Sequence, residues 1–202
     1  MKKYLVLFIF WSCETHYLPK PKGYNRIVLP TVSYTQLLSK LPYTFEHSCH
    51  AKILKDTSWI AEPNWIHIYY PYFDANVQLT YKPINADSSI QDYLNDSFRL
   101  TGKHQVKATA IDEKILSLKN GNIATISELS GEVPSPFQFH VTDSITHFLR
   151  GALYFKMSTK NDSLAPAIKF IKSDLIHLLL SLIHISEPTR PLYISYAVFC
   201  LK

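Results

Sequence analysis

The stretch QFHVTDSITHFLRGALYF, from Gln138 to Phe155, gives the clearest indication of the fold. At its start the apolar Phe139 and Val141 alternate with the polar His140 and Thr142. Because successive side chains of a strand point to opposite faces of a sheet, this alternation predicts a half-buried strand. The stretch therefore begins as a strand with one face in the core.

The middle of the stretch is rich in capping residues. Asp143 or Ser144 can accept hydrogen bonds from free backbone N–H groups, so we expect a short helical turn over residues 145–150. Gly151 follows, where a left-handed residue would close the turn without the penalty of a Cβ atom. Residues 152–155 then resume as a strand. The predicted order is strand, capped helical turn and strand.

The rest of the pattern predicts an antiparallel meander and two main helices. Tight turns such as Asn120-Gly121 make neighbouring strands antiparallel, and two amphipathic helices can cover the sheet they form. The fold class is therefore α+β, a single layered domain whose antiparallel sheet is covered by two main helices, similar in topology to the Mog1/PsbP sandwich. Strands are expected at 43–46, 51–54, 65–70, 77–81, 110–118 and 123–129, a short helical turn at 34–40, and main helices at 88–108 (capped by Asp87 or Ser88, weakened or bent at Gly102) and 161–178 (Pro166 in its first turn).

The N-terminus has the pattern of a lipoprotein export signal. Lys2 and Lys3 precede an apolar segment, residues 4–11, which is too short to span a bilayer as a helix, and Ser12 and Cys13 follow it. We interpret 1–12 as a signal peptide and Cys13 as the lipidation site; the alternative is an ordinary signal peptide or short anchor with an incidental cysteine. Alternating prolines in 13–24 predict an extended tether.

The folded domain is expected to span residues 25–180. The remaining segment, 181–202, has the character of translated adapter sequence, with Pro188 and Pro191 breaking the preceding helix and an uncharged apolar run behind them. We expect this tail to pack poorly and leave it out of the functional argument. The alternative is a genuine C-terminal strand.

Charge and cysteine content narrow the function classes. Residues 13–180 hold 17 basic and 15 acidic residues, without the clustered basic face that nucleic acid requires, so no nucleic-acid partner is expected. Of the three cysteines, Cys13 is the predicted lipid site and Cys200 lies in the tail. Cys49 is then alone in the domain, which predicts no internal disulfide.

The sequence contains no common catalytic or cofactor signature. The patterns HExxH, CxxC, GxSxG, GxGxxG and the P-loop are all missing, and no histidine spacing suggests a metal site, so neither a cofactor nor a catalytic residue is assigned. Asp143, Ser144 and His147 have the residue types of a hydrolytic triad, but capping accounts better for the first two. Arg150 is expected either to close the turn or to offer a bidentate donor to a carboxylate of the domain or of a partner.

Several blocks of this sequence, taken together and in order, resemble the gliding-motility lipoprotein GldD family. The resemblance implies an envelope lipoprotein that supports gliding and is linked to type IX secretion, with other proteins of that apparatus as partners. It brings no catalytic residues. The blocks are the lipobox Cys13, PKPKGYNRI (19–27), YTFEHS (43–48), WIHIYYPYFDANVQLTYKPI (65–84), KHQVKATAI (103–111), the stretch quoted above and NDSLAPAIKFIKSDL (161–175).

The leading hypothesis is therefore a lipid-anchored interaction module in the cell envelope. A periplasm-facing position is preferred because no acidic run follows Glu14, and the outer membrane is preferred over the inner one. His147, Arg150 and Trp65 are the candidate partner-binding or structural residues. The rival hypotheses are a hydrolase that uses Ser144 and His147, and a small-ligand carrier with a pocket lined by Trp65, Tyr69 and Tyr81. Asp143-Ser144-Ile145 and Asp162-Ser163-Leu164 also match an O-glycosylation tripeptide, although capping explains both.

Overall fold

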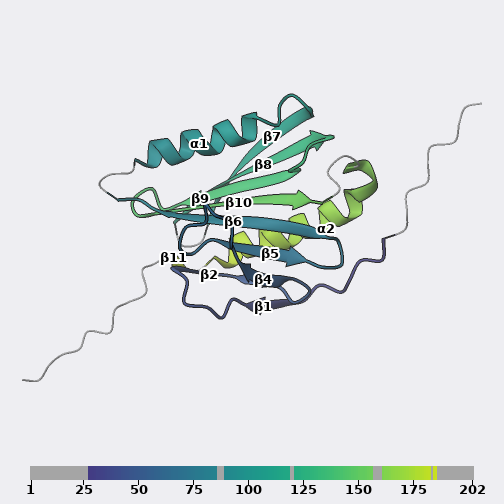
Figure 1. Cartoon of the computed structure of the whole chain (residues 1–202), viewed down its shortest axis with the longest axis horizontal. Helices are drawn as coiled ribbons and strands as arrows, with labels where there is room; N and C mark the ends of the chain where they lie inside the picture. Colours follow the sequence, from purple (N-terminus) through teal and green to yellow (C-terminus); the bar gives the residue numbers. More distant parts are fainter. Residues whose placement is uncertain (1–26, 86–88, 119–120, 157–160, 183, 186–202) are drawn as a thin grey trace, which may run out of the picture.

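The computed structural model describes residues 27–85, 89–118, 121–156, 161–182 and 184–185 (Figure 1). Its centre is a seven-stranded antiparallel sheet in the order β4-β5-β6-β10-β9-β8-β7, with α1 on one face and α2 on the other. The predicted α+β class, with two main helices on an antiparallel sheet, is confirmed. The elements are β1 (Tyr34–Gln36), β2 (Tyr43–Thr44), β3 (Glu46–Ser48), β4 (Lys52–Lys55), β5 (Ile66–Tyr70), β6 (Ala75–Pro83), α1 (Ile90–Gly102), β7 (Ala108–Ser117), β8 (Ile123–Gly131), β9 (Phe137–Thr142), β10 (His147–Phe155), α2 (Asn161–Ser181) and β11 (His184–Ile185).

Residues 138–155, which give the clearest indication of the fold in the sequence, form the β9–β10 hairpin at the middle of this sheet. The expected helical turn over 145–150 is wrong, because β10 already begins at His147. Oδ1 of Asp143 accepts hydrogen bonds from the backbone N–H groups of Ile145, Thr146 and His147 at 2.9–3.0 Å. The capping chemistry was predicted, but here it closes a tight turn between two strands instead of beginning a helix.

Gly151 has a different role from the one expected. It lies inside β10, directly opposite Phe139 of β9, and not in a left-handed position. A Cβ atom at Gly151 would stand only 2.2 Å from Cζ of Phe139. Glycine is required here because the aromatic ring of the neighbouring strand lies over its backbone.

The core lies between the sheet and α2. Phe137, Phe139 and Val141 of β9 face this core, and so do the alternating residues of the other central strands. The predicted apolar side of the last helix is confirmed, since Ile171, Leu175, Leu178 and neighbouring residues are buried against the sheet. Burial of each such side chain contributes about 1.5–3 kcal/mol, and this layer holds the fold together.

The predicted hairpins on either side of the centre are confirmed. In β5 the buried and half-buried residues alternate as expected, with Ile66, Ile68 and Tyr70 in the core. The strands predicted at 110–118 and 123–129 form β7 and β8, and Gly121 between them has a φ of 83°. Asn120, the other residue of that predicted turn, lies outside the described residues.

Four local predictions differ from the structure. The short helical turn at 34–40 is wrong, because Tyr34 pairs with Ser48 across β1 and β3. The strand expected at 43–46 is split into β2 and β3. Helix α1 ends at Gly102 instead of near 108, and Ser89 is its N-cap, whereas the expected caps at 87 and 88 lie outside the described residues. Pro166 lies inside α2, not in its first turn.

The domain continues past the expected boundary at residue 180. Helix α2 runs through Ser181, Leu182 is 3% exposed, and β11 pairs with β2. The segments 1–26 and 186–202, which hold the predicted signal, the tether and most of the predicted tail, lie outside the described residues. Neither α1 nor α2 is long and apolar enough, over its described residues, to cross a bilayer.

Candidate functional site

Two of the predicted site residues, His147 and Arg150, lie on the same strand but on opposite faces of the sheet. His147 is buried on the core side, where its Nδ1 and the hydroxyl group of Tyr81 are joined by a 2.7 Å hydrogen bond. Arg150 points to the face that carries α1, and its Nη2 donates to Oε1 of Gln138 at 2.6 Å. The two residues therefore belong to separate environments and do not form one site.

The structure does not assemble the hydrolase alternative. Ser144 is exposed in the turn, has a φ of 65°, and its backbone N–H donates to Oγ1 of Thr142. The ring of His147 is hydrogen-bonded to the hydroxyl group of Tyr81, and no hydrogen bond joins it to Ser144 in this part of the described chain. Hydrogen bonds from Thr146 and from the turn's backbone outweigh partial burial and hold the pKa of Asp143 at about 2, so its carboxylate is a capping group.

The aromatic pocket of the ligand-carrier alternative is not formed either. The indole N–H of Trp65 donates to the backbone oxygen of Tyr81 at 2.9 Å, and Lys82 lies over the indole ring at 5.2 Å. Tyr81 faces the core, whereas Tyr69 faces the other side of the sheet and donates to Asp74. Trp65 thus joins the start of β5 to β6, and the three aromatic residues do not line a common cavity.

A polar layer lies between α1 and the centre of the sheet. We call Arg150, Gln138, His140, Ser97 and Thr101 the α1 polar layer. Oε1 of Gln138 accepts from Arg150 and also from the hydroxyl group of Thr101 at 3.1 Å. Oγ of Ser97 lies in hydrogen-bond contact, at 3.2 Å, with Nδ1 of His140. Polar side chains on the inner side of α1 explain why this helix packs on the sheet through hydrogen bonds as well as apolar contacts.

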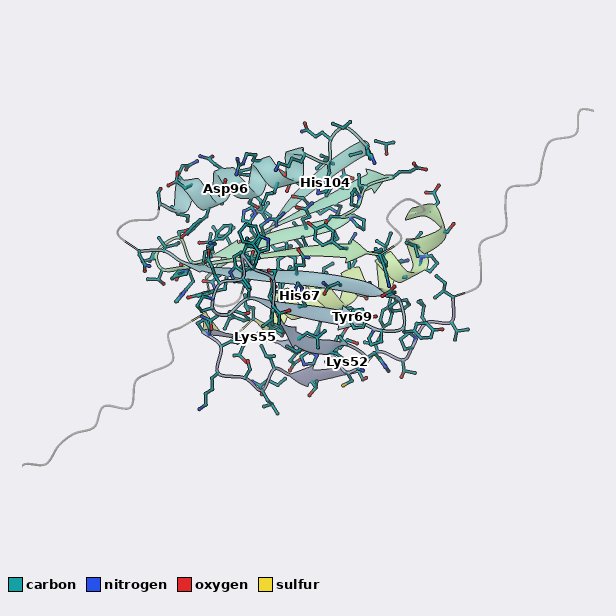
Figure 2. The ribbon with its side chains drawn as sticks, in the orientation of Figure 1. Lys52, Lys55, His67, Tyr69, Asp96 and His104 are labelled. Carbon is teal, nitrogen blue, oxygen red and sulfur yellow. The ribbon has the colours of Figure 1, made fainter. Side chains whose placement is uncertain are left out.

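Burial gives this layer unusual electrostatics. Desolvation, and secondarily the positive charge of Arg150, lowers the pKa of His140 to about 4. The same two causes lower the pKa of His104, which follows the end of α1 (Figure 2). Burial also lowers the pKa of Arg150, although a guanidinium group stays charged in proteins. At neutral pH the layer therefore holds one cation, Arg150, beside the neutral imidazole of His140, and the neutral ring of His104 flanks it.

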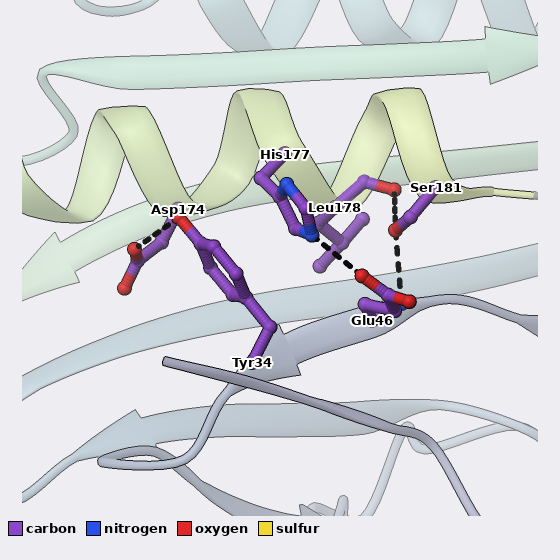
Figure 3. A network of polar contacts seen from close by, with 6 residues as sticks. All are labelled: Tyr34, Glu46, Asp174, His177, Leu178 and Ser181. Atoms are coloured by element: carbon purple, nitrogen blue, oxygen red, sulfur yellow. Dashed lines mark hydrogen bonds and ion pairs between the residues drawn. The ribbon is translucent and has the colours of Figure 1, made fainter. Parts of the chain in front are cut away.

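A second polar cluster joins the first strands of the domain to α2 (Figure 3). We call Tyr34, Glu46, Asp174, His177 and Ser181 the α2 clamp. The hydroxyl group of Tyr34 donates to Oδ1 of Asp174 at 3.2 Å, and its ring stacks on His177 with centroids 3.7 Å apart. His177 pairs with Glu46 at 2.7 Å, and the backbone N–H of Glu46 donates to Oγ of Ser181.

The electrostatics of the α2 clamp centre on Asp174, which is 2% exposed. Burial raises its pKa, against the hydrogen bond from Tyr34 and the nearby hydroxyl groups of Ser48 and Tyr70, which favour the carboxylate. The pKa of Tyr34 is raised as well, first by burial and then by the adjacent Asp174. These are the features of a structural polar contact inside a fold, and they position β1 and β3 firmly on α2.

The described residues contain no group of three or more metal-ligating side chains that could hold an ion. An open groove of about 380 Å³ lies between β8 and the first half of α2. Its most prominent charge, Glu128, is already paired with Lys114 and Lys172. The groove therefore offers no unpaired charge at Glu128, and its lining also carries Asp162 and Lys169.

Sequence reasoning missed the α2 clamp and the role of Gln138. Asp174 was the available signal, because it interrupts the apolar stripe of α2 one turn from Ile171 and Leu178. Its partner Tyr34 is 140 residues away, and nothing in the local pattern indicates that pairing. The sequence pattern around Gln138 indicates only a polar residue that alternates with the apolar Phe139 along a strand.

The fold and these clusters define a one-domain α+β protein whose polar groups are used mainly to join its own layers. Within that class, the chain belongs to the gliding motility lipoprotein GldD family, whose family model matches residues 14–184. The predicted family is confirmed, and the match extends beyond the expected domain end at 180. The lipoprotein family also indicates association with the cell envelope.

Comparison with other proteins adds a likeness in fold. The chain is similar to the solution structure of cyanobacterial PsbP (CyanoP) from Synechocystis sp. PCC 6803, with a TM-score of 0.43 and 11% sequence identity. That similarity covers 74% of this chain and 95% of the PsbP chain. No curated protein sequence matches the chain.

Proposed function

We propose that this protein is a lipid-anchored, non-catalytic accessory component of the bacterial gliding machinery, linked to type IX secretion. The observation that carries the proposal is the family match over residues 14–184, which begins directly after Cys13. Acyl chains on Cys13 would hold the domain at the outer membrane, facing the periplasm. Its partners would be other envelope proteins of the gliding and secretion apparatus.

The α2 clamp supports this proposal because of its place in the chain. The first described strand, β1, follows the N-terminal segment that would carry the lipid, and the clamp fixes β1 and β3 to α2. A force applied through a tether at Cys13 would thus reach the core helix through Tyr34 and Glu46.

The arrangement of the predicted site residues also favours a binding protein. His147 and Trp65 are engaged in internal hydrogen bonds, and Ser144 lacks the contact with His147 that nucleophilic catalysis requires. His147 and Trp65 therefore stabilise the fold, and we expect partner contact at the outer surface of the domain. Exposed apolar side chains on separate loops, Trp59, Val106 and Ile145, offer places at which to look for it.

The test begins with native protein from the envelope of cells that carry this chain. Intact mass should show acylation of the mature chain, and Cys13→Ser should remove the added mass and release the protein from the membrane fraction. An unmodified mass for the native protein would overturn the lipid anchor.

A second arm maps the partner. A photo-crosslinking residue is placed in turn at positions 59, 106 and 145, which are 96%, 92% and 74% exposed and lie on different loops. The proposal predicts strong crosslinks to envelope proteins of the gliding apparatus from one position and weak ones from the others. Equal, weak labelling from all three positions, or substrate turnover by the purified protein that is lost in Ser144→Ala, would contradict it.

A further inference from the structure

Arg150 is a cation at the middle of the sheet without an acidic partner. It lies on β10, between Thr80 of β6 and His140 of β9, and none of the ion pairs between described residues includes it. The acidic residue at the centre of α1, Asp96, pairs with Arg99 of the same helix on the outer side. Because an unpaired cation costs free energy when it leaves water, a half-buried arginine calls for a compensating anion.

Two hydrogen-bond donors beside this charge have no acceptor. Nε of Arg150 is buried without a hydrogen-bond partner, and so is Nε2 of Gln138, a residue that is only 2% exposed. The orientation of the Gln138 amide is set by its oxygen, which accepts from both Arg150 and Thr101. Turning the amide round would set its N–H₂ group against Nη2 of Arg150, and a guanidinium nitrogen cannot accept a hydrogen bond, so the unpaired N–H group is a fixed feature of the layer.

The α1 polar layer is only partly covered by its neighbours. Helix α1 covers the sheet over β9 and β10, whereas on the adjacent strand β6 the side chain of Gln78 is exposed and that of Thr80 is half-buried. His104, after the end of α1, and Tyr154, four residues beyond Arg150 on the same face of β10, are also half-buried. Arg150 itself is half-buried, between these more open positions and the strands that α1 covers.

We propose that the α1 polar layer is a binding site for a small oxyanion, a carboxylate or a phosphate, held by Arg150 and the side-chain amide of Gln138. An oxyanion neutralises the guanidinium charge and accepts from the two unpaired donors together, which no single uncharged group does as well. His104 and His140 lie beside this site and are uncharged at neutral pH, so they add polar surface and leave Arg150 as the cation that binds the anion.

Binding should have a direct electrostatic consequence for His140. The Arg150 charge is one of the two causes that lower the pKa of this residue, so an anion that neutralises Arg150 removes part of the shift. The pKa of His140 therefore rises when the site is filled. The other ionisable groups that face Arg150 are His104, from the end of α1, and Tyr154, on β10 itself.

The experiment is an NMR titration of the exported chain carrying Cys13→Ser, which keeps the full domain but is not acylated. The probes are acetate and inorganic phosphate, against sodium chloride at matched ionic strength. We expect saturable shifts of the Arg150 Nε–H signal with a dissociation constant of roughly 1–10 mM for at least one probe, the range that so few ligand atoms allow. A preference between planar acetate and tetrahedral phosphate identifies the class of ligand.

Three variants make the result specific. Arg150→Lys keeps the charge but loses the fork of donors, and should weaken binding about tenfold. Gln138→Glu places a carboxylate of nearly the same shape beside Arg150, so it should abolish binding, raise the melting temperature and raise the pKa of His140. Arg99→Lys changes an exposed arginine of α1 and should leave binding unchanged.

The proposal is overturned if neither probe gives a saturable shift at Arg150 up to about 50 mM, well above the affinity expected for this site. It is also overturned if Gln138→Glu binds the anion as well as the parent chain. Should Arg150→Lys fail to fold, Gln138→Glu still decides, since it keeps every apolar contact of the layer.

Discussion

Replacing Gly151 by alanine should damage the centre of the sheet far more than such a small change usually does. The new Cβ atom would lie 2.2, 2.3 and 2.9 Å from three ring atoms of Phe139, where ordinary contacts begin at 3.4 Å. Phe139 is 2% exposed and surrounded by the core, so its ring must move by more than 1 Å into occupied space. Overpacking of this kind costs about 1–3 kcal/mol or more, against less than about 1 kcal/mol gained by removing a glycine from a strand.

We therefore expect Gly151→Ala to lower the free energy of unfolding by about 2–3 kcal/mol. Urea unfolding, followed by tryptophan fluorescence, measures this change. The double variant Gly151→Ala with Phe139→Leu should recover part of the loss, because the clash is removed together with the ring. Gly102→Ala is the matched control: its Cβ would meet nothing within 4 Å, and it should raise stability by up to about 1 kcal/mol. A Gly151→Ala variant within about 0.5 kcal/mol of the parent chain would refute the reasoning.

Three more outcomes follow from the polar contacts. Asp143→Ala removes one acceptor from three backbone N–H groups and should cost about 1–2 kcal/mol at pH 7. Since the pKa of Asp143 is lowered to about 2, the stabilisation that its carboxylate gives the fold is complete above pH 3.8 and is lost as the pH falls toward 2. Chemical unfolding at both pH values measures this, and an equal loss of unfolding free energy for Asp143→Ala at pH 7 and at pH 2 would contradict it. The pKa of Asp174 is raised, so the contribution of this residue to the stability of the fold is most favourable below pH 3.8 and falls as the pH rises. Asp174→Asn should therefore unfold at a higher temperature than the parent chain at pH 7, and the difference should shrink in acid. A variant that is less stable than the parent at pH 7 would disprove the burial argument. Trp65→Phe removes the hydrogen bond to the backbone oxygen of Tyr81 and should cost about 1 kcal/mol in thermal unfolding, whereas no loss would show that this bond is dispensable.

Sequence patterns predicted the strands well wherever burial alternates along the chain. In β5 and β6 the core takes every second residue, so residues such as Ile68 and Val77 reveal the face they occupy. The same logic gave the apolar side of α2, because Ile171 and Leu178 recur at helical spacing. These features are local, and one window of sequence contains all the information they need.

The errors come from chemistry that serves two structures equally well. An aspartate that accepts from N–H groups ahead of it can begin a helix or close a hairpin, and Asp143 does the latter. A glycine can provide a positive φ or leave room for a ring, and only the pairing of Gly151 with Phe139 shows which is needed. Choosing between such alternatives requires the strand register, which local sequence does not contain.

The candidate sites were the least predictable part for a similar reason. Tyr34 and Asp174 meet across 140 residues, and Arg150 and Gln138 meet only because β9 and β10 pair in one register. The sequence left two roles open for Arg150, closing the turn after Asp143 or donating to a carboxylate of the domain or of a partner. The structure adds that no carboxylate of the described chain pairs with it, and that a second donor lies beside it unpaired.

The most direct test of the central claim is the gliding speed of single cells whose only family member is this chain with Cys13→Ala. Immunoblots establish that parent and variant chains are present in equal amounts. The account predicts that the parent chain restores gliding and that the variant, folded but released from the membrane, leaves cells stationary. Normal gliding by cells that carry only the unanchored chain would contradict the claim that this protein works as a membrane-held part of the machinery.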